Sequence, residues 1–111
     1  MKAIRVERTG GPEGMKLVEL PTPVPGAGEA LIRVEAAGVN FLDVYVRSGA
    51  YEREMPLILG EEGAGVVEAV GDRVSAPKVG QRVAWAHVSS SYATHVLSLI
   101  HISEPTRQAE I

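Results

Sequence analysis

Four polar side chains between residues 40 and 51 have types that bind a small molecule by hydrogen bonding and stacking: Asn40, Asp43, Tyr45 and Tyr51. The Asn40 amide both donates and accepts hydrogen bonds, and each tyrosine offers a ring face together with a hydroxyl. Three of them also have structural explanations. Asn40 and Asp43 suit the start of a helix, and Tyr45 suits a core in which its hydroxyl is satisfied. Tyr51 lies in a polar loop and is harder to assign to a core.

The composition disfavours metal binding. The sequence contains no cysteine, so it offers neither disulfides nor thiolate ligands. His87 and His95 are candidate ligands, but single histidines in or beside two strands, without a third ligand, are more often structural. We therefore predict a site without metal.

Size and charge point to one domain and exclude some partners. A chain of 111 residues with 45% hydrophobic residues can bury a core of its own. The formal net charge is −3, and basic and acidic residues are interspersed, so we expect neither nucleic acid nor a membrane surface as a partner. Because no apolar run is long enough to cross a bilayer, we expect a cytoplasmic protein.

The elements that position these residues are short strands and a single helix. Asn40 caps the predicted helix over residues 40–47, which has Asp43 in its first turn and Gly49 after its end. Within the strand at residues 29–39, alternation places Leu31 on the polar face and Ile32 on the buried face. The other predicted strands are residues 2–7, 15–20, 63–71, 81–85 and 92–96, with a turn at 9–14 and an extended proline-rich connector at 21–25. This pattern predicts a mainly β fold, a small barrel or sandwich with one short helix.

Three parts of the sequence together resemble the medium-chain dehydrogenase/reductase superfamily. They are Lys2-Ala3-Ile4 with Gly10-Gly11-Pro12-Glu13, the segment 37–49, and the pair of segments 59–67 and 79–83. Within the superfamily they are similar to the zinc-independent quinone oxidoreductase (zeta-crystallin-like) branch. The resemblance implies a GroES-like barrel, the N-terminal catalytic domain of that family, without the Rossmann domain that follows it.

The same resemblance implies a site and a reaction. Zinc members of the superfamily have a cysteine ligand where this chain has Asn40, and a histidine ligand where it has Glu61. The resemblance implies metal-free hydride transfer from NADPH to a quinone or another small conjugated carbonyl. It places Asn40, Asp43, Tyr45 and Tyr51 in the catalytic cleft, and Asn40, Leu42 and Tyr45 near the cofactor.

We interpret residues 1–96 as the substrate-side domain and residues 97–111 as a non-native tail, because residues 97–107 resemble a translated sequencing adapter. Family members continue for about 200 further residues into a nucleotide-binding domain. We therefore expect this chain to be inactive by itself. The resemblance also implies that the full-length form is a homodimer. The alternatives are a zinc-free enoyl or alkenal reductase of the same superfamily, and a stand-alone GroES-like binding module.

Overall fold

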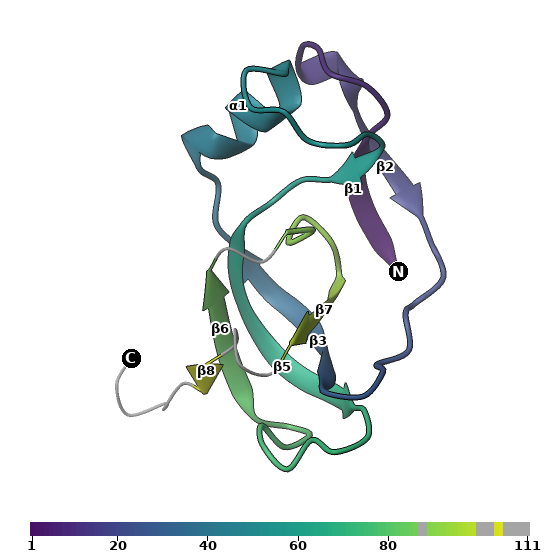
Figure 1. The fold of residues 1–111 in the computed structure, drawn as a ribbon, viewed down its shortest axis with the longest axis vertical. Coiled ribbons are helices and arrows are strands. Elements are labelled where there is room, and N and C mark those ends of the chain that lie inside the picture. Colours follow the sequence, from purple (N-terminus) through teal and green to yellow (C-terminus); the bar gives the residue numbers. More distant parts are fainter. Residues whose placement is uncertain (87–88, 100–103, 106–111) are drawn as a thin grey trace.

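The computed structural model describes residues 1–86 and 89–99, and the backbone of residues 104–105. The described strands form two antiparallel sheets, one ordered β2-β1-β4 and the other β7-β3-β5-β6-β8. Figure 1 shows helix α1 beside the smaller sheet at one end of the molecule and the larger sheet at the other end. This arrangement confirms the prediction of a mainly β domain with a short helix. The elements are β1 (Lys2–Val6), η1 (Pro12–Gly14), β2 (Met15–Glu19), β3 (Glu29–Ala37), α1 (Phe41–Ser48), β4 (Leu57–Ile58), β5 (Glu62–Val70), β6 (Arg82–Ala86), β7 (His95–Leu99) and β8 (Glu104–Pro105).

The smaller sheet is built on the hairpin that the sequence predicts. Strands β1 and β2 pair from Lys2 opposite Glu19 to Val6 opposite Met15, and the turn between them contains the short 3-10 helix η1. Strand β4 pairs with the other side of β1, where Leu57 lies opposite Val6. The sequence analysis missed β4 because two residues are too short to show a periodic pattern.

The larger sheet departs from the simple alternation expected for residues 29–39. Ala30, Leu31 and Ile32 are all buried, although alternation places Leu31 on a polar face. The ladder between β3 and β5 shifts register between Leu31 and Ile32 and again before Ala36. At the first shift the residue without a partner is Glu68 of β5, so β3 keeps its alternation there. Ala30 and Ile32 belong to the apolar cluster of the larger sheet and Leu31 does not, so Leu31 is buried on the face of β3 that was expected to be polar. The prediction was therefore wrong for Leu31, while Arg33 and Glu35 are exposed as expected.

The strand predicted at residues 92–96 lies further along the chain. Strand β7 covers His95–Leu99 and pairs with β3, with Leu97 opposite Leu31 and Ser98 opposite Ala30. The proposed boundary between residues 96 and 97 therefore falls within a strand. Of the predicted non-native tail, residues 97–99 belong to β7, and residues 100–103 and 106–111 lie outside the described residues.

Two apolar clusters form the core, one at each end of the molecule. The larger sheet holds the cluster Ala30, Ile32, Val67, Val83, Trp85 and Val96. The Trp85 indole N–H in that cluster donates a hydrogen bond of 2.8 Å to Ser91 Oγ. Under α1, Val6, Val46 and Leu59 form the second cluster, against which Leu42 and Tyr92 pack. This second cluster holds α1 on the smaller sheet and so fixes the candidate site residues that the helix carries.

Helix α1 has the ends that the sequence predicts. Asn40 is its N-cap, Asp43 lies in its first turn, and Gly49 follows its last residue with a φ of 92°. Asp43 and Val46 are its buried residues, one helical turn apart, so a narrow face is turned to the core. In the part of the chain that the structure describes, no helix is both long and apolar enough to span a membrane.

Candidate functional site

The beginning of α1 is held by hydrogen bonds between Asn40 and Asp43. The Asp43 backbone N–H donates to the Asn40 carbonyl oxygen at 3.0 Å. In return, the Asn40 backbone N–H donates to Asp43 Oδ2 at 2.9 Å, which is the reciprocal bond of a capping box. The structural role expected for Asp43 at the helix start is therefore observed. Its carboxylate also fixes the backbone of Asn40.

Asp43 has a second partner far along the chain. The side chain of Asp43 is buried, with 4% of the residue exposed. Its Oδ2 accepts a hydrogen bond of 2.6 Å from the hydroxyl of Tyr92, which lies 49 residues further on. Sequence reasoning did not select Tyr92 as a site residue. No local pattern signals a contact made by a single residue across such a separation.

The Tyr92 phenol is held in its neutral form. Burial raises its pKa, and the hydrogen bond to Asp43 and the negative charge of that carboxylate raise the pKa further. Because the folded state keeps this proton while an unfolded tyrosine loses it near pH 10, the unfolded state binds fewer protons at high pH. Stability from this contact is thus present below about pH 10 and is lost as the pH rises above it.

We therefore expect the free energy of unfolding to fall more steeply with pH in the unchanged chain than in the Tyr92→Phe variant. Above about pH 10 the two slopes should differ by up to about 1.4 kcal/mol per pH unit. Urea denaturation at closely spaced pH values between about 9 and 11, followed by the fluorescence of Trp85, measures this slope. The control is Tyr51→Phe, which removes an exposed phenol and should keep the slope of the unchanged chain. An equal slope in Tyr92→Phe and in the unchanged chain would contradict the assignment.

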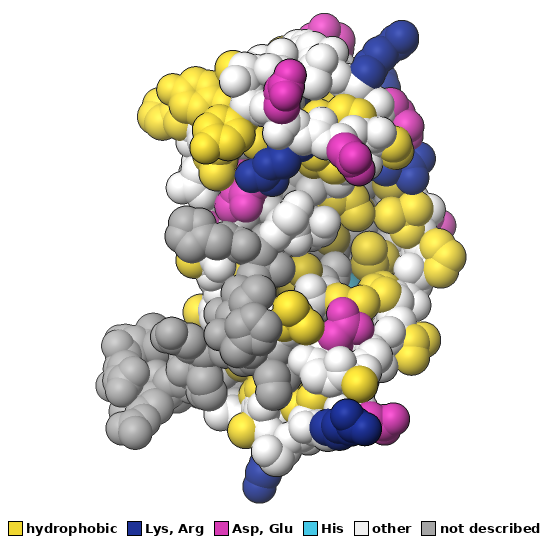
Figure 2. Space-filling view, viewed as in Figure 1, with side chains coloured by type: hydrophobic (Ala, Val, Ile, Leu, Met, Phe, Trp, Pro, Cys, Tyr) yellow, Lys and Arg dark blue, Asp and Glu magenta, His cyan; other side chains and the backbone are white. Residues whose placement is uncertain are grey.

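Tyr45 on α1 and Tyr51 in the loop after the helix are both exposed, whereas Asp43 is buried. Phe41, Tyr45 and Tyr51 are 82%, 50% and 55% exposed. The backbone N–H of Tyr51 donates to the Tyr45 carbonyl oxygen at 3.0 Å, which ties the loop after the helix to its end. Figure 2 shows hydrophobic side chains gathered at the upper left, where Figure 1 places α1. We call Phe41, Tyr45 and Tyr51 the aromatic face.

Helix geometry separates the predicted site residues into two groups. Residues two positions apart on an α-helix point about 200° apart, so the buried Asp43 and the exposed Tyr45 face opposite ways. Leu42 is half-buried and packs against the cluster under the helix. Asn40 is half-buried at the helix start. The structure thus brings Tyr45 and Tyr51 together, and joins Asp43 to Asn40 and Tyr92 instead.

Of the two positions where zinc members have ligands, Asn40 caps α1 and Glu61 forms an ion pair. Glu61 Oε1 lies 3.3 Å from Arg53 Nη1, and 13% of the Glu61 side chain is exposed. His95 Nε2 lies 2.8 Å from Glu68 Oε2, while His87 lies outside the described residues. No group of three metal-ligating side chains occurs among residues 1–86 and 89–99.

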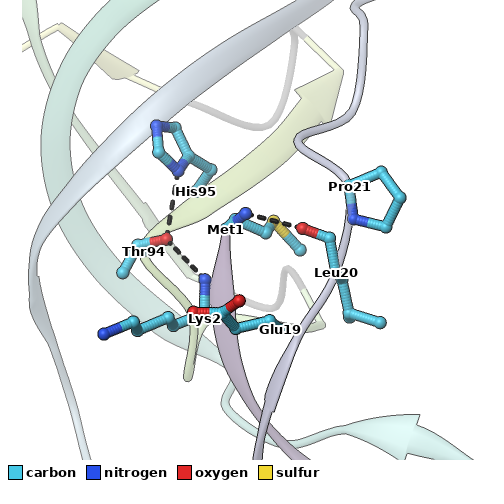
Figure 3. Close-up of a pocket in the computed structure, with 7 residues that line it drawn as sticks. All are labelled: Met1, Lys2, Glu19, Leu20, Pro21, Thr94 and His95. Carbon is cyan, nitrogen blue, oxygen red and sulfur yellow. Dashed lines mark hydrogen bonds between the residues drawn. The ribbon is translucent and has the colours of Figure 1, made fainter.

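A groove between the smaller sheet and β7 contains none of the residues predicted for the cleft, although the candidate ligand His95 lines it. Its volume is about 670 Å³, and Figure 3 shows the seven residues that line it. Its polar groups bond to one another: the N-terminal amine of Met1 donates to the Leu20 carbonyl oxygen at 2.6 Å, and the backbone N–H of Lys2 donates to Thr94 Oγ1 at 3.1 Å. Because the N-terminal amine, the Lys2 backbone N–H and Thr94 Oγ1 are already paired, the groove is a weaker candidate than the surface of α1.

The fold and the segment around α1 define an alcohol dehydrogenase GroES-like domain. The model of that family matches residues 26–98, and the chain belongs to this family. The fold inferred from the sequence resemblance is thereby confirmed.

The relatives and solved structures that the chain matches include several quinone oxidoreductases. The chain is 47% identical over 105 residues to the quinone oxidoreductase of Lama guanicoe, covering 91% of this chain and 32% of the relative. It matches the crystal structure of the Escherichia coli quinone oxidoreductase complexed with NADPH with a TM-score of 0.94 and 32% identity, over 98% of this chain and 34% of the other. A mycobacterial quinone oxidoreductase matches with a TM-score of 0.90 and 44% identity, over 97% of this chain and 34% of the other. The chain thus spans about a third of the length of these relatives.

Proposed function

We propose that this chain is the substrate-side domain of an NADPH-dependent quinone oxidoreductase, which transfers a hydride from NADPH to a quinone. The observation that carries the proposal is the aromatic face. Phe41 leaves 82% of its area in solvent, and an exposed cluster of large apolar side chains is typical of a binding surface. Flat rings of this kind suit stacking against a quinone or a nicotinamide. The relatives named as quinone oxidoreductases support the same substrate class.

NADPH would meet this domain with its nicotinamide end only. A dinucleotide site needs parallel strands joined through a helix, with a glycine-rich turn at the helix start, and every strand pairing in the described residues is antiparallel. The side chains present fit the other end of the cofactor: Asn40 suits the carboxamide, and the tyrosine rings suit the nicotinamide face. When bound, NADPH supplies the hydride.

The chain's own residues would position the reactants. In this proposal Asn40 and Tyr45 contact the nicotinamide, and Leu42 supports Asn40 and Tyr45 from the half-buried side of the helix start. Tyr51 contacts the quinone, whose oxygens accept hydrogen bonds from the tyrosine hydroxyl. We propose that Asp43 acts through Asn40 as a positioning residue, because its Oδ2 accepts from the Asn40 backbone and its side chain is buried.

Zinc does not fit this site. A catalytic zinc needs about three ligands from cysteine, histidine or carboxylate side chains. The sequence has no cysteine, and Asn40 stands at one of the ligand positions. At the other, Glu61 is paired with the guanidinium of Arg53, whose positive charge opposes a metal ion. We therefore propose reduction by positioning and hydrogen bonding, without a metal.

We expect no steady NADPH oxidation with benzoquinone by the 111-residue chain alone. Binding the dinucleotide needs the part of the relatives that this chain does not cover. Fusing residues 1–96 to that remaining part of the Escherichia coli relative should restore the activity, which is followed by the loss of NADPH absorbance. The reductase alternative is tested with cyclohexenone in the same assay. A fusion that reduces cyclohexenone and not benzoquinone supports an enoyl reductase, and turnover by the chain alone contradicts the proposal.

The remaining expectations about the whole protein are proposals of the same kind. We propose a cytoplasmic homodimer whose native domain sequence ends near residue 96 and is followed by an adapter-like tail. DNA sequencing of the source locus across the Leu97 codon tests the tail. A reading frame that continues into a glycine-rich strand-turn-helix unit supports the reductase, and a stop codon after Ile111 favours the binding module.

A further inference from the structure

Tyr92 connects the smaller sheet to the beginning of α1. It lies in the segment before β7 and is half-buried against the cluster under the helix. Its hydroxyl donates a hydrogen bond of 2.6 Å to Asp43 Oδ2, and the same oxygen accepts from the Asn40 backbone N–H at 2.9 Å. Two successive hydrogen bonds therefore lead from Tyr92 through Asp43 to Asn40, the residue to which we assign a contact with the nicotinamide.

The backbone of Tyr92 is fixed by the smaller sheet. Its carbonyl oxygen accepts from the Ile4 backbone N–H in β1 at 2.8 Å. Its own N–H donates to the carbonyl oxygen of Leu59, the residue after β4, also at 2.8 Å. Because both backbone groups of Tyr92 are bonded, the position of its ring is set by this sheet.

The Tyr92 ring is also closely packed. A Cβ built on Gly60 would lie 2.7 Å from Tyr92 Cδ1, so the ring lies directly against the Gly60 backbone. The cluster under α1 packs against the ring as well. Close packing leaves a side chain few alternative rotamers, and the phenol oxygen is therefore held in place beside Asp43.

The Asp43 carboxyl group depends on this donor. It is buried, and its Oδ1 has no hydrogen-bond partner within the described part of the chain. Its two described donors, the Tyr92 hydroxyl and the Asn40 N–H, both bond to Oδ2. A buried carboxylate that loses one such donor is strongly disfavoured. Without the hydroxyl we expect Asp43 to turn toward solvent and to release the Asn40 backbone.

We propose that Tyr92 is a positioning residue for hydride transfer. By fixing Asp43 it fixes the backbone of Asn40, and with it the amide side chain that contacts the nicotinamide. This inference rests on the proposed function and adds to it a residue that contacts neither reactant. Small errors in the geometry of reacting groups lower a reaction rate steeply, so we expect the support of Asn40 to act on kcat.

Hydrogen exchange in the 111-residue chain, followed by ¹H–¹⁵N NMR, tests the support of Asn40 without NADPH or a quinone. The Tyr92→Phe variant removes only the hydroxyl. We expect its Asn40 amide to exchange at least about tenfold faster relative to the amide of Val67 in the larger sheet. The control is Ile32→Val, which lowers stability within the larger sheet and should leave this ratio unchanged. An unchanged ratio in Tyr92→Phe would overturn the proposal, because a general loss of stability affects both amides alike.

The activity of the fusion of residues 1–96 to the remaining part of the Escherichia coli relative tests the effect on hydride transfer. Tyr92→Phe should lower kcat with benzoquinone about tenfold or more, and should change KM for NADPH less than about twofold. Ile32→Val should keep the kcat of the unchanged fusion. An unchanged kcat in Tyr92→Phe contradicts the positioning role. A fusion that is inactive before any substitution contradicts the proposed function instead, and the exchange ratio then decides whether Tyr92 supports Asn40.

An Asp43→Ala background tests whether Tyr92 acts through the carboxylate. With the acceptor removed, Tyr92→Phe should change kcat less than about twofold, because the two substitutions disrupt the same chain of bonds. A tenfold loss that persists in this background would show a different route and overturn the proposal. If the Asp43→Ala variant does not fold, the exchange ratio and the kcat of Tyr92→Phe alone decide.

Discussion

Replacing Gly60 by alanine is expected to lower the free energy of unfolding by about 4 kcal/mol, through strain and overlap together. Gly60 has a φ of +106°, a backbone conformation that residues with a Cβ rarely adopt. A Cβ at this position would lie 2.7 Å from both the backbone nitrogen and Cδ1 of Tyr92. Relief of the overlap would have to displace the residue that donates to Asp43, so the substitution disturbs the site as well as the fold.

The matched control is Gly80→Ala. Gly80 has a similar φ of +90°, but nothing lies within 4 Å of a Cβ built on it. Strain alone should cost about 1 to 2 kcal/mol there. Urea denaturation monitored by Trp85 fluorescence measures both variants, and the difference between them isolates the contact with Tyr92. Equal losses at the two glycines would show that the close approach to Tyr92 carries no cost.

Replacing Ile32 by alanine should destabilise the domain by about 2 to 5 kcal/mol. Ile32 is completely buried, and it packs in the cluster of the larger sheet with Val67, Val83 and Trp85. Removing its methyl and methylene groups leaves a cavity that the surrounding strands fill only in part. A loss of this size is a large fraction of the stability of a small domain.

Two milder substitutions make this prediction specific. Ile32→Val should cost about 0.5 to 1.5 kcal/mol. Leu17→Ala removes a leucine that is 68% exposed on β2 and should change stability by no more than about 0.5 kcal/mol. Thermal or urea unfolding ranks the three variants. If Ile32→Ala unfolds no more easily than Leu17→Ala, the cluster of the larger sheet is not the main source of stability.

Local features of the fold were predictable from the sequence. The hairpin of β1 and β2 follows from two strand-like segments and the glycine-rich turn between them. Helix α1 was predicted within a residue of its observed ends, because Asn40, Asp43 and Gly49 are strong end signals. Because Asp43 and Tyr45 are two positions apart on a helix, the sequence also implies that their side chains face opposite ways. The sequence analysis nevertheless placed both in one cleft.

Features that depend on register or distant contacts were not predictable. Leu31 is buried on the face of β3 that its alternation assigns to solvent, and the pattern of β3 alone carries no sign of it. The pairing of Arg53 with Glu61 joins a loop to the residue before β5. Both depend on which segments pack beside these residues in the folded chain, and the local sequence does not specify those segments.

The sequence by itself determined the family, helix α1 with its ends, and the lack of thiolate ligands, because each of these resides in the order and types of neighbouring residues. Only the tertiary structure joined Asp43 to Tyr92 across 49 residues and left the other carboxylate oxygen buried without a described donor. It also decided that Tyr45 and Tyr51 are exposed while Leu42 packs against the core. The physical reason is that burial and pairing are set by the segments that pack against a residue, and those segments come from distant parts of the chain.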